Sequence, residues 1–302
     1  MVPVERSEIE STLQPYVLRR FKRDDAAWTD HLRELRKGGP GRVWWARLRA
    51  LIGQSAKGVA RVKHDYSGVW SQDQLPGAPA IENARYFLTW GEEGLEVRGW
   101  AEKRVHLLLL SKMLESFAPA SVLEVGSGNG LVLMMLAVGH PTIRFTGVEL
   151  TDAGISAARR MQLQPQLLVA VSSALPFQAV EPDAFRAVEF RQGNAANLPF
   201  ADGTFDVVMT SLALEQMNQV KRQALRELAR VARKRVLMLE PFRDFNTTPE
   251  RFYYTRSRDY LSASVTDLAQ YGLRPLHVFA DFPSKVTRGV GLVVAEPLHI
   301  TP

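Results

Sequence analysis

The stretch Val122-Leu-Glu-Val-Gly-Ser-Gly-Asn-Gly130 joins a short apolar run to three alternating glycines. An apolar run of this length that ends in glycine predicts a buried strand followed by a tight turn. The apolar residues 131–138 predict a helix directly after that turn. Glycines let the backbone approach a ligand closely, and a helix N-terminus offers free N–H groups. We therefore expect residues 124–130 to form a ligand-binding loop between a strand and a helix.

Short apolar segments alternate with amphipathic ones on both sides of this loop. Strands are expected at 121–125, 143–150, 187–192, 205–210 and 235–240, and helices at 99–117, 131–138, 152–161, 217–232 and 259–271. Such alternation predicts a parallel sheet covered on both faces. Residues 275–282 and 291–295 resemble two further strands, whose short link allows an antiparallel hairpin. The expected fold class is α/β, a three-layer sandwich with a mostly parallel sheet.

The first 97 residues lack this alternation and predict a mainly helical extension. Clusters of Gly and Pro at 37–41 and 76–79 would interrupt its helices. Between these breaks, five apolar residues fall on one helical face: Trp44, Trp45, Leu48, Leu51 and Ile52, flanked by Arg42, Arg47 and Arg49. We therefore divide the chain into an N-terminal extension, 1–97, and a main domain, 98–302.

Composition limits the classes of protein that fit. The chain has 302 residues, of which 46% are hydrophobic, so it is long enough to bury a full core. It has no cysteine, which excludes disulfides and thiolate chemistry, and we see no metal-binding pattern. No apolar run approaches the roughly 20 residues of a membrane span. The polar N-terminus does not resemble a signal peptide, so a cytoplasmic location is expected.

The spacing within the loop narrows the choice of ligand. A pyrophosphate-binding dinucleotide loop prefers Gly-x-Gly-x-x-Gly, whereas the spacing here is Gly-x-Gly-x-Gly. Glu124, just before the glycines, is unfavourable beside a pyrophosphate but useful beside an ammonium group. Glu149 ends the next expected strand, where a carboxylate can accept hydrogen bonds from both ribose hydroxyls. A nucleoside that carries an ammonium group, such as S-adenosylmethionine (SAM), fits both carboxylates.

Two later segments extend this pattern. Gly193-Asn-Ala-Ala-Asn-Leu-Pro-Phe200 precedes Asp202-Gly-Thr-Phe-Asp-Val-Val-Met209. With the glycine loop, Glu149 and the final hairpin, they resemble the Rossmann-like class I SAM-dependent methyltransferases over Arg98 to Pro297. The resemblance is greatest to the group of ubiquinone/menaquinone-biosynthesis and natural-product enzymes. It implies a seven-stranded sheet whose last strand is antiparallel.

The resemblance also assigns roles to residues of the cofactor site. It places Glu124, Gly126, Gly128 and Gly130 around the methionine part, Glu149 at the ribose, and Asn194 and Ala195 at the adenine. Ser127, within the glycine loop, is a further candidate cofactor residue, and Leu150, next to Glu149, could pack on the adenine ring. The family often has Asp where this chain has Asn194, although an amide can also hydrogen-bond the adenine edge.

Methyl transfer from a sulfonium is an in-line displacement, so the protein mainly supplies proximity and alignment. A general base is needed only when the acceptor must lose a proton. Glu215, after the fourth strand, is our first candidate, with a surface or helix-capping carboxylate as the alternative. Glu240, at the end of the fifth strand, is a second candidate unless it pairs with an Arg. Tyr254 is a third candidate, with packing as the alternative. His106 lies in an apolar helix, where a satisfied core histidine is expected.

Three roles are compatible with the basic stretch in the N-terminal extension. Residues 32–63 contain nine Lys and Arg but one acidic residue, Glu34. This stretch could lie on an anionic membrane surface, track nucleic-acid phosphates, or pack on the core or on a second subunit in a homodimer. No nucleic-acid-binding module accompanies it, which argues against nucleic acid.

We expect a SAM-dependent methyltransferase (EC 2.1.1.-) that acts on a small molecule of specialised metabolism. The alternatives are an RNA methyltransferase that uses the basic extension and a SAM-binding scaffold without catalysis.

Overall fold

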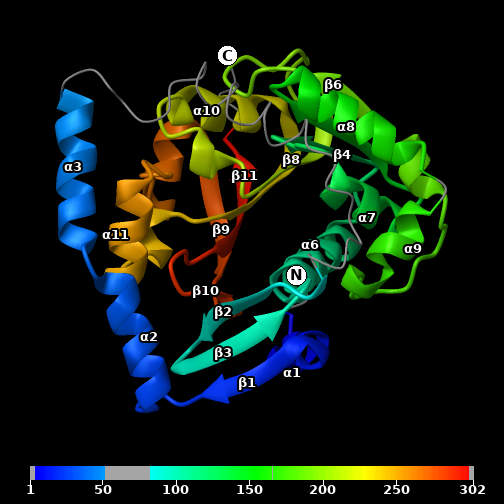
Figure 1. Cartoon of the computed structure of the whole chain (residues 1–302). Coiled ribbons are helices and arrows are strands. Elements are labelled where there is room, and N and C mark those ends of the chain that lie inside the picture. Colours follow the sequence, from blue (N-terminus) through cyan, green and yellow to red (C-terminus); the bar gives the residue numbers. More distant parts are fainter. Residues whose placement is uncertain (1–3, 52–81, 165, 299–302) are drawn as a thin grey trace.

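The computed structural model describes residues 4–51, 82–164 and 166–298 (Figure 1). Its N-terminal elements are α1 (Arg6–Leu13), η1 (Gln14–Tyr16), β1 (Val17–Phe21), α2 (Ala26–Arg36), α3 (Gly39–Leu51), β2 (Arg85–Trp90), β3 (Glu93–Arg98) and α6 (Ala101–Phe117). The next are β4 (Ser121–Val125), α7 (Leu131–Gly139), β5 (Arg144–Glu149), α8 (Asp152–Gln162), α9 (Leu167–Val171), η2 (Ser172–Ala174), η3 (Ala184–Ala187), β6 (Glu189–Gln192) and β7 (Phe205–Ser211). The last are η4 (Leu214–Gln216), α10 (Lys221–Val231), β8 (Ala232–Glu240), η5 (Arg243–Phe245), α11 (Pro249–Ser257), η6 (Val265–Tyr271), β9 (Leu273–Phe279), β10 (Ser284–Lys285) and β11 (Gly291–Pro297).

The main sheet has seven strands in the order β6-β5-β4-β7-β8-β11-β9. The pairs from β6 to β8 are parallel, and β11 is antiparallel to both β8 and β9. This confirms the expected seven-stranded sheet with an antiparallel last strand. Since β4 through β8 are parallel, the loops after β4, β5, β6 and β7 meet at one edge of the sheet, where α/β proteins bind ligands.

Alternate side chains of the central strands enter two cores. Val207 and Met209 of β7 belong to the core that includes α6 and α7, whereas Val208 belongs to the core that includes α10. Strand side chains point alternately to the two faces of a sheet, so each strand is buried on both. The sheet therefore lies between two helical layers, as a three-layer sandwich requires.

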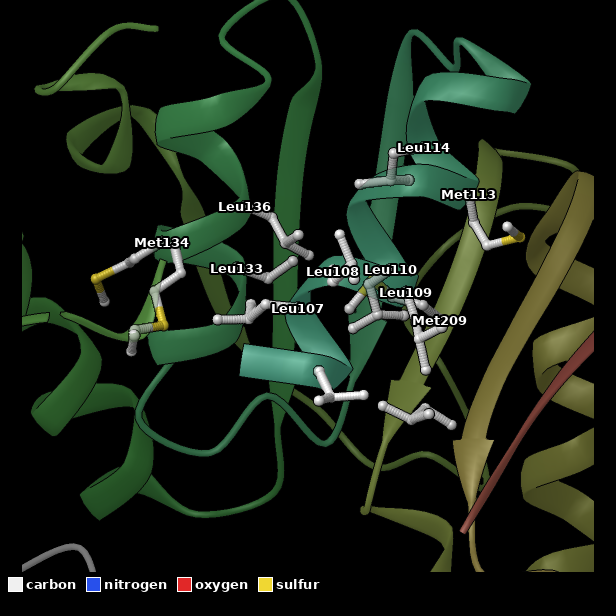
Figure 2. Packing of buried hydrophobic residues seen from close by; sticks show 14 of the residues in the cluster. Leu107, Leu108, Leu109, Leu110, Met113, Leu114, Leu133, Met134, Leu136 and Met209 are labelled. Atoms are coloured by element: carbon white, nitrogen blue, oxygen red, sulfur yellow. The ribbon is translucent and has the colours of Figure 1, made fainter. Parts of the chain in front are cut away.

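Helix α6 fills the centre of the larger core. Its residues Leu107–Leu110 lie between α7, which contributes Leu133 and Leu136, and Met209 of β7 (Figure 2). Four consecutive leucines give α6 apolar residues all round, which is typical of a helix buried on every side. Burial holds α6 in place beside the ligand-binding edge of the sheet.

The N-terminal extension contains the expected helices together with strands that the sequence pattern did not predict. Strands β1, β3, β2 and β10 form a second, antiparallel sheet. Burial alternates along the second half of β2, because Leu88 and Trp90 are buried while Phe87 and Thr89 are partly exposed. The helix break predicted at 37–41 occurs at Gly38, where φ is +68° between α2 and α3. The break predicted at 76–79 lies outside the described residues.

Two other elements differ from expectation. The helix predicted at 259–271 is wrong in its first half, because Asp259 has a φ of +53° and the helical turns start only at Val265. Ser264 and Asp267 form a capping box that fixes this later start. Helix α11 was not predicted, although Thr248 and Pro249 provide a usual helix start. Among the described residues, no helix is long and apolar enough to span a membrane.

Candidate active site

A cavity of about 410 Å³ opens at the edge of the sheet where β4, β5, β6 and β7 end. Its lining comes from α6, from the loops after these four strands and from the segment before α10: Lys103, Glu124, Val125, Gly126, Ser127, Gly128, Asn129, Leu131, Val132, Val148, Glu149, Leu150, Thr151, Gly193, Asn194, Ala195, Ser211, Leu212, Ala213, Gln216, Met217, Gln219 and Val220. Eight of the nine predicted cofactor residues belong to this lining, and only Gly130 does not. The predicted cofactor segments therefore converge on one cavity.

The glycine loop has the backbone that its sequence indicates. Gly126, Gly128 and Gly130 all have positive φ values, of +80°, +56° and +74°. A side chain on Gly126 would come within 2.5 Å of the Ala213 Cβ, so this glycine lets the segment after β7 approach the loop. A side chain on Gly130 would come within 2.2 Å of Phe190. Gly130 thus acts in packing at the start of α7, away from the cavity.

Two buried polar side chains of the lining lack partners. Glu124 is 2% exposed, and neither its Oε2 nor the Ser127 hydroxyl has a hydrogen bond. Burial raises the pKa of Glu124 to about 8, against the opposing charge of Lys103. Burial also lowers the pKa of Lys103, and Glu124 and Glu102 oppose that shift. Because orphaned polar groups are costly inside a protein, these side chains are poised to bind a polar ligand.

Glu149 is held rigidly at the end of β5. Its Oε1 accepts hydrogen bonds from the backbone N–H and hydroxyl of Thr151, at 2.9 and 2.8 Å, and its Oε2 accepts one from Gly128 N–H at 3.2 Å. A carboxylate has four lone-pair positions, so it can still accept a hydrogen bond from a ribose hydroxyl. The same bonds tie the glycine loop to the end of β5.

The segment after β6 forms the far wall of the cavity. Asn194 is exposed, and its side-chain carbonyl accepts a hydrogen bond from Ala196 N–H at 3.0 Å. Its side-chain amide and the second lone pair of its carbonyl are left to meet a ligand. Ala195 is buried, and with Leu150 and Val148 it gives this wall an apolar character that suits an adenine ring.

The ionisable side chains of the cavity fit the methionine and ribose parts of SAM. Glu124 matches the ammonium of its methionine part, Lys103 matches the carboxylate, and Glu149 matches the ribose. Lys103 was missed from sequence, where it is one charge at the start of an apolar helix. Lys103 could have been noticed because it stands beside Glu102 on a helix that is otherwise largely apolar.

The three catalytic candidates lie outside the lining of this cavity. Glu215 is 5% exposed, and its Oε2 accepts a hydrogen bond from Arg288 at 2.9 Å. It is neither a surface nor a helix-capping carboxylate, contrary to the alternative considered for it. Its neighbours Gln216 and Met217 do line the cavity, so the Glu215–Arg288 pair adjoins the wall.

Glu240 has a positioning role in the structure. Its Oε1 accepts hydrogen bonds from the backbone N–H groups of Ala213 and Leu214, at 2.9 and 3.1 Å. Within the described part of the chain, its Oε2 has no hydrogen-bond partner, so the alternative of an ion pair with an Arg is wrong. Burial raises the pKa of Glu240 to about 8. Glu240 fixes the segment after β7, which carries Ala213 into the cavity wall.

Tyr254 lies on α11 beside Tyr260, with ring centroids 6.0 Å apart. Burial and the nearby Glu215 charge raise the pKa of Tyr260 above its usual range. Tyr260 thus lies near the Glu215–Arg288 pair, and Tyr254 contacts Tyr260.

A buried polar cluster around α6 was also missed from sequence. The Arg288 guanidinium lies 3.9 Å from the Glu102 carboxylate, and Glu102, His106 and Arg288 each keep a buried polar atom without a hydrogen bond. His106 was expected to be a satisfied core histidine, but its Nε2 lacks a partner. Burial lowers its pKa to about 4, which leaves the imidazole neutral at physiological pH. Within the described ranges, no group of side chains has the composition of a metal site.

Comparisons with known proteins identify the kind of domain that contains this cavity. Residues 123–239 match the family model of the methyltransferase domain. The chain is 26% identical over 167 residues to the uncharacterized methyltransferase YcgJ of Bacillus subtilis, a match that covers 54% of this chain and 58% of that protein. It is 25% identical over 151 residues to demethylmenaquinone methyltransferase of Porphyromonas gingivalis, a match that covers 50% of each. The chain thus spans about half the length of the curated relatives it matches.

Among solved structures, the [4+2]-cyclase SpnF shares the fold. Its TM-score is 0.55 at 15% identity, and the alignment covers 80% of this chain and 97% of that one. Residues 123–239 therefore form a methyltransferase domain, and the sheet order together with this likeness shows the Rossmann-like fold of class I SAM-dependent methyltransferases.

Proposed function

We propose that this protein transfers the methyl group of SAM to a small-molecule acceptor of specialised metabolism. The observation that carries the proposal is the meeting of Glu124, Lys103 and Glu149 in one cavity, because these charges match the methionine and ribose parts of SAM. The fold alone leaves the reaction open, since its neighbour SpnF is named as a cyclase.

A second cavity supports a small-molecule acceptor. It has a volume of about 910 Å³, within the size range of small-molecule sites, and its lining includes Asn218 and Tyr260. Met217 and Gln219 line the first cavity, so the two cavities lie on either side of the segment 216–220. The relative from Porphyromonas gingivalis is named for demethylmenaquinone, itself a small molecule.

Bound SAM supplies a methyl group that its sulfonium has already activated. The protein's own residues hold the two ends of the cofactor and set the line of attack. Where the acceptor must lose a proton, Glu215, Glu240 and Tyr254 remain our candidates for the base. Glu215 is favoured, because it adjoins the cavity wall and because Glu240, with its raised pKa, would first have to lose its own proton.

The Glu215→Gln variant tests this role. We expect turnover to fall by about 10²-fold or more while the Kd for SAM changes little, because a general base acts only in the chemical step. Turnover equal to that of the unchanged protein would remove Glu215 from the mechanism. Calorimetry with SAM supplies the binding constant.

Transfer of a radiolabelled methyl group from SAM tests the function itself. The protein is incubated with separate small-molecule, RNA and protein fractions of a bacterial extract, and the label in each is counted. Label in the small-molecule fraction supports the proposal. Label in RNA would instead favour the alternative of an RNA methyltransferase. SAM binding without label in any fraction would favour a scaffold.

A further inference from the structure

Helix α3 presents two tryptophans to solvent. Trp44 and Trp45 are 58% and 57% exposed, and their rings meet edge to face with centroids 5.1 Å apart. Two adjacent, largely exposed tryptophans are costly in water and mark interaction surfaces. One possibility considered from the sequence was that the Trp face packs on the core of the same chain. The exposure of these two side chains contradicts it.

The tryptophans face away from the rest of the molecule. Helix α3 lies at the outer edge of the structure, next to α11 (Figure 1). Its inner face carries Val43 and Ala46, which line the second cavity. With 3.6 residues per turn, Trp44 and Trp45 lie on the opposite side of the helix, and Leu48 lies between them on that side. The outer face of α3 is thus a continuous apolar stripe.

The charge of α3 selects an anionic partner. The helix contains three arginines and no acidic residue, and residues 32–63 contain nine Lys and Arg against one acidic residue. Self-association through this face would bring like charges together, which disfavours a homodimer at this surface. An apolar stripe with tryptophans on a basic helix has the composition of a helix that lies in a membrane interface.

We propose that α3 docks the protein on the surface of an anionic lipid bilayer, with Trp44, Trp45 and Leu48 in the headgroup region. The arginine-rich composition of the helix favours a surface of anionic lipid phosphates. Since Val43 and Ala46 lie on the other side of the same helix, docking places the second cavity close to the bilayer. The docking itself does not depend on the proposed reaction.

Co-sedimentation with lipid vesicles tests this proposal. We expect the full chain to bind vesicles of equal parts phosphatidylcholine and phosphatidylglycerol, and to bind vesicles of phosphatidylcholine alone at least tenfold more weakly. The double variant Trp44→Gln/Trp45→Gln should bind anionic vesicles at least tenfold more weakly than the unchanged protein. Both tryptophans are exposed, so the variant should keep its fold, as circular dichroism checks.

A matched control separates a specific surface from general stickiness. Leu163 and Val180 are also exposed apolar residues, 77% and 66% exposed, and lie outside α3. Leu163→Ser/Val180→Ser should bind vesicles as the unchanged protein does. Equal binding by the Trp double variant would overturn the proposal. So would a homodimer that the same variant dissociates in analytical ultracentrifugation, or binding to single-stranded RNA without binding to vesicles.

Discussion

Glu124 and Lys103 are two ionisable side chains, one buried and one half-buried, in the wall of one cavity. Glu124 keeps an orphaned oxygen, and burial lowers the pKa of Lys103 even though two carboxylates oppose the shift. Such groups are expensive in a folded protein unless a ligand completes them. A zwitterionic amino-acid group would do so for both residues at once.

Lys103→Met tests the carboxylate end of the cofactor. We expect the Kd values for SAM and for S-adenosylhomocysteine to rise by about tenfold, which corresponds to about 1.4 kcal/mol for one lost charged contact. Binding of 5′-methylthioadenosine, which lacks the amino-acid group, should not change. Lys112→Met is the control on the same helix, because Lys112 pairs with Glu8. Calorimetry with the three ligands decides, and equal losses for all three would contradict the assignment.

Glu124 makes cofactor affinity depend on pH. Its pKa is about 8 in the free protein, whereas the proposed contact with the SAM ammonium needs the ionised carboxylate. Binding below pH 8 must therefore release a proton, so affinity should rise between pH 5.5 and 7.5, by up to about tenfold per unit. Lys103, Glu149 and Glu240 lie near enough to shift this pKa, but all three side chains remain in a Glu124→Gln variant.

Glu124→Gln should consequently bind SAM more weakly and with a nearly flat pH profile over this range. The measurement is the Kd at several pH values, in buffers of different ionisation enthalpy, which also counts the protons released. An unchanged slope in the variant would show that another group titrates.

Some residues of the site could be predicted from the sequence next to them, and others could not. Glu124, Gly126 and Glu149 could be predicted, because each stands next to the strand end that places it. Lys103 and Arg288 could not, because they come from α6 and from the loop before β11, which only the folded chain brings to the cavity region. The sequence pattern predicted the same role for Gly130 as for the neighbouring glycines. In the structure, a side chain at this position is excluded by the ring of Phe190, which is distant in sequence.

At the scale of elements, the start of α7 depends on the close approach of Gly130 to the Phe190 ring. Gly130→Ala introduces a Cβ at a positive φ and within 2.2 Å of the Phe190 ring. We expect the free energy of unfolding to fall by about 1–3 kcal/mol, from backbone strain and overpacking. Gly41→Ala is the control, since no atom lies within 4 Å of its Cβ position and the residue is helical. Urea denaturation measures both, and equal stabilities would contradict the steric role of Gly130.

The elements of the main sheet were predictable because each central strand is an apolar run between polar turns. The strands of the second sheet were not, since β1 carries two arginines and β3 two glutamates and an arginine. β2 and β3 are neighbours in sequence, but β1 and β10, which pair with them, come from distant parts of the chain. Strand β10 has two residues, too few for any periodic pattern. Its pairing with β2 joins the extension to the loop before β11.

At the scale of the whole molecule, the extension and the main domain share one core. Leu88, Trp90 and Leu95 belong to the same buried cluster as the leucines of α6. Trp90 is 2% exposed, and its Nε1 donates a hydrogen bond to Asp281 at 2.8 Å. The division at residue 97, made from the sequence pattern, remains a prediction about folding units, and the shared core argues for cooperative unfolding.

Trp90→Ala distinguishes one folding unit from two. Removing a buried tryptophan costs about 3–5 kcal/mol, so we expect the unfolding temperature to fall for the whole molecule in a single transition. Saturating SAM, which binds the main domain, should raise the midpoint of that same transition because it stabilises only the folded state. Trp45→Ala is the control, since its exposed side chain should change the free energy of unfolding by about 0.5 kcal/mol or less. Calorimetry that resolves two transitions, with only the later one shifted by SAM, would establish residues 1–97 as a separate unit. A single shifted transition would mean that the surface helix α3, the second sheet and the cofactor site are parts of one cooperative structure.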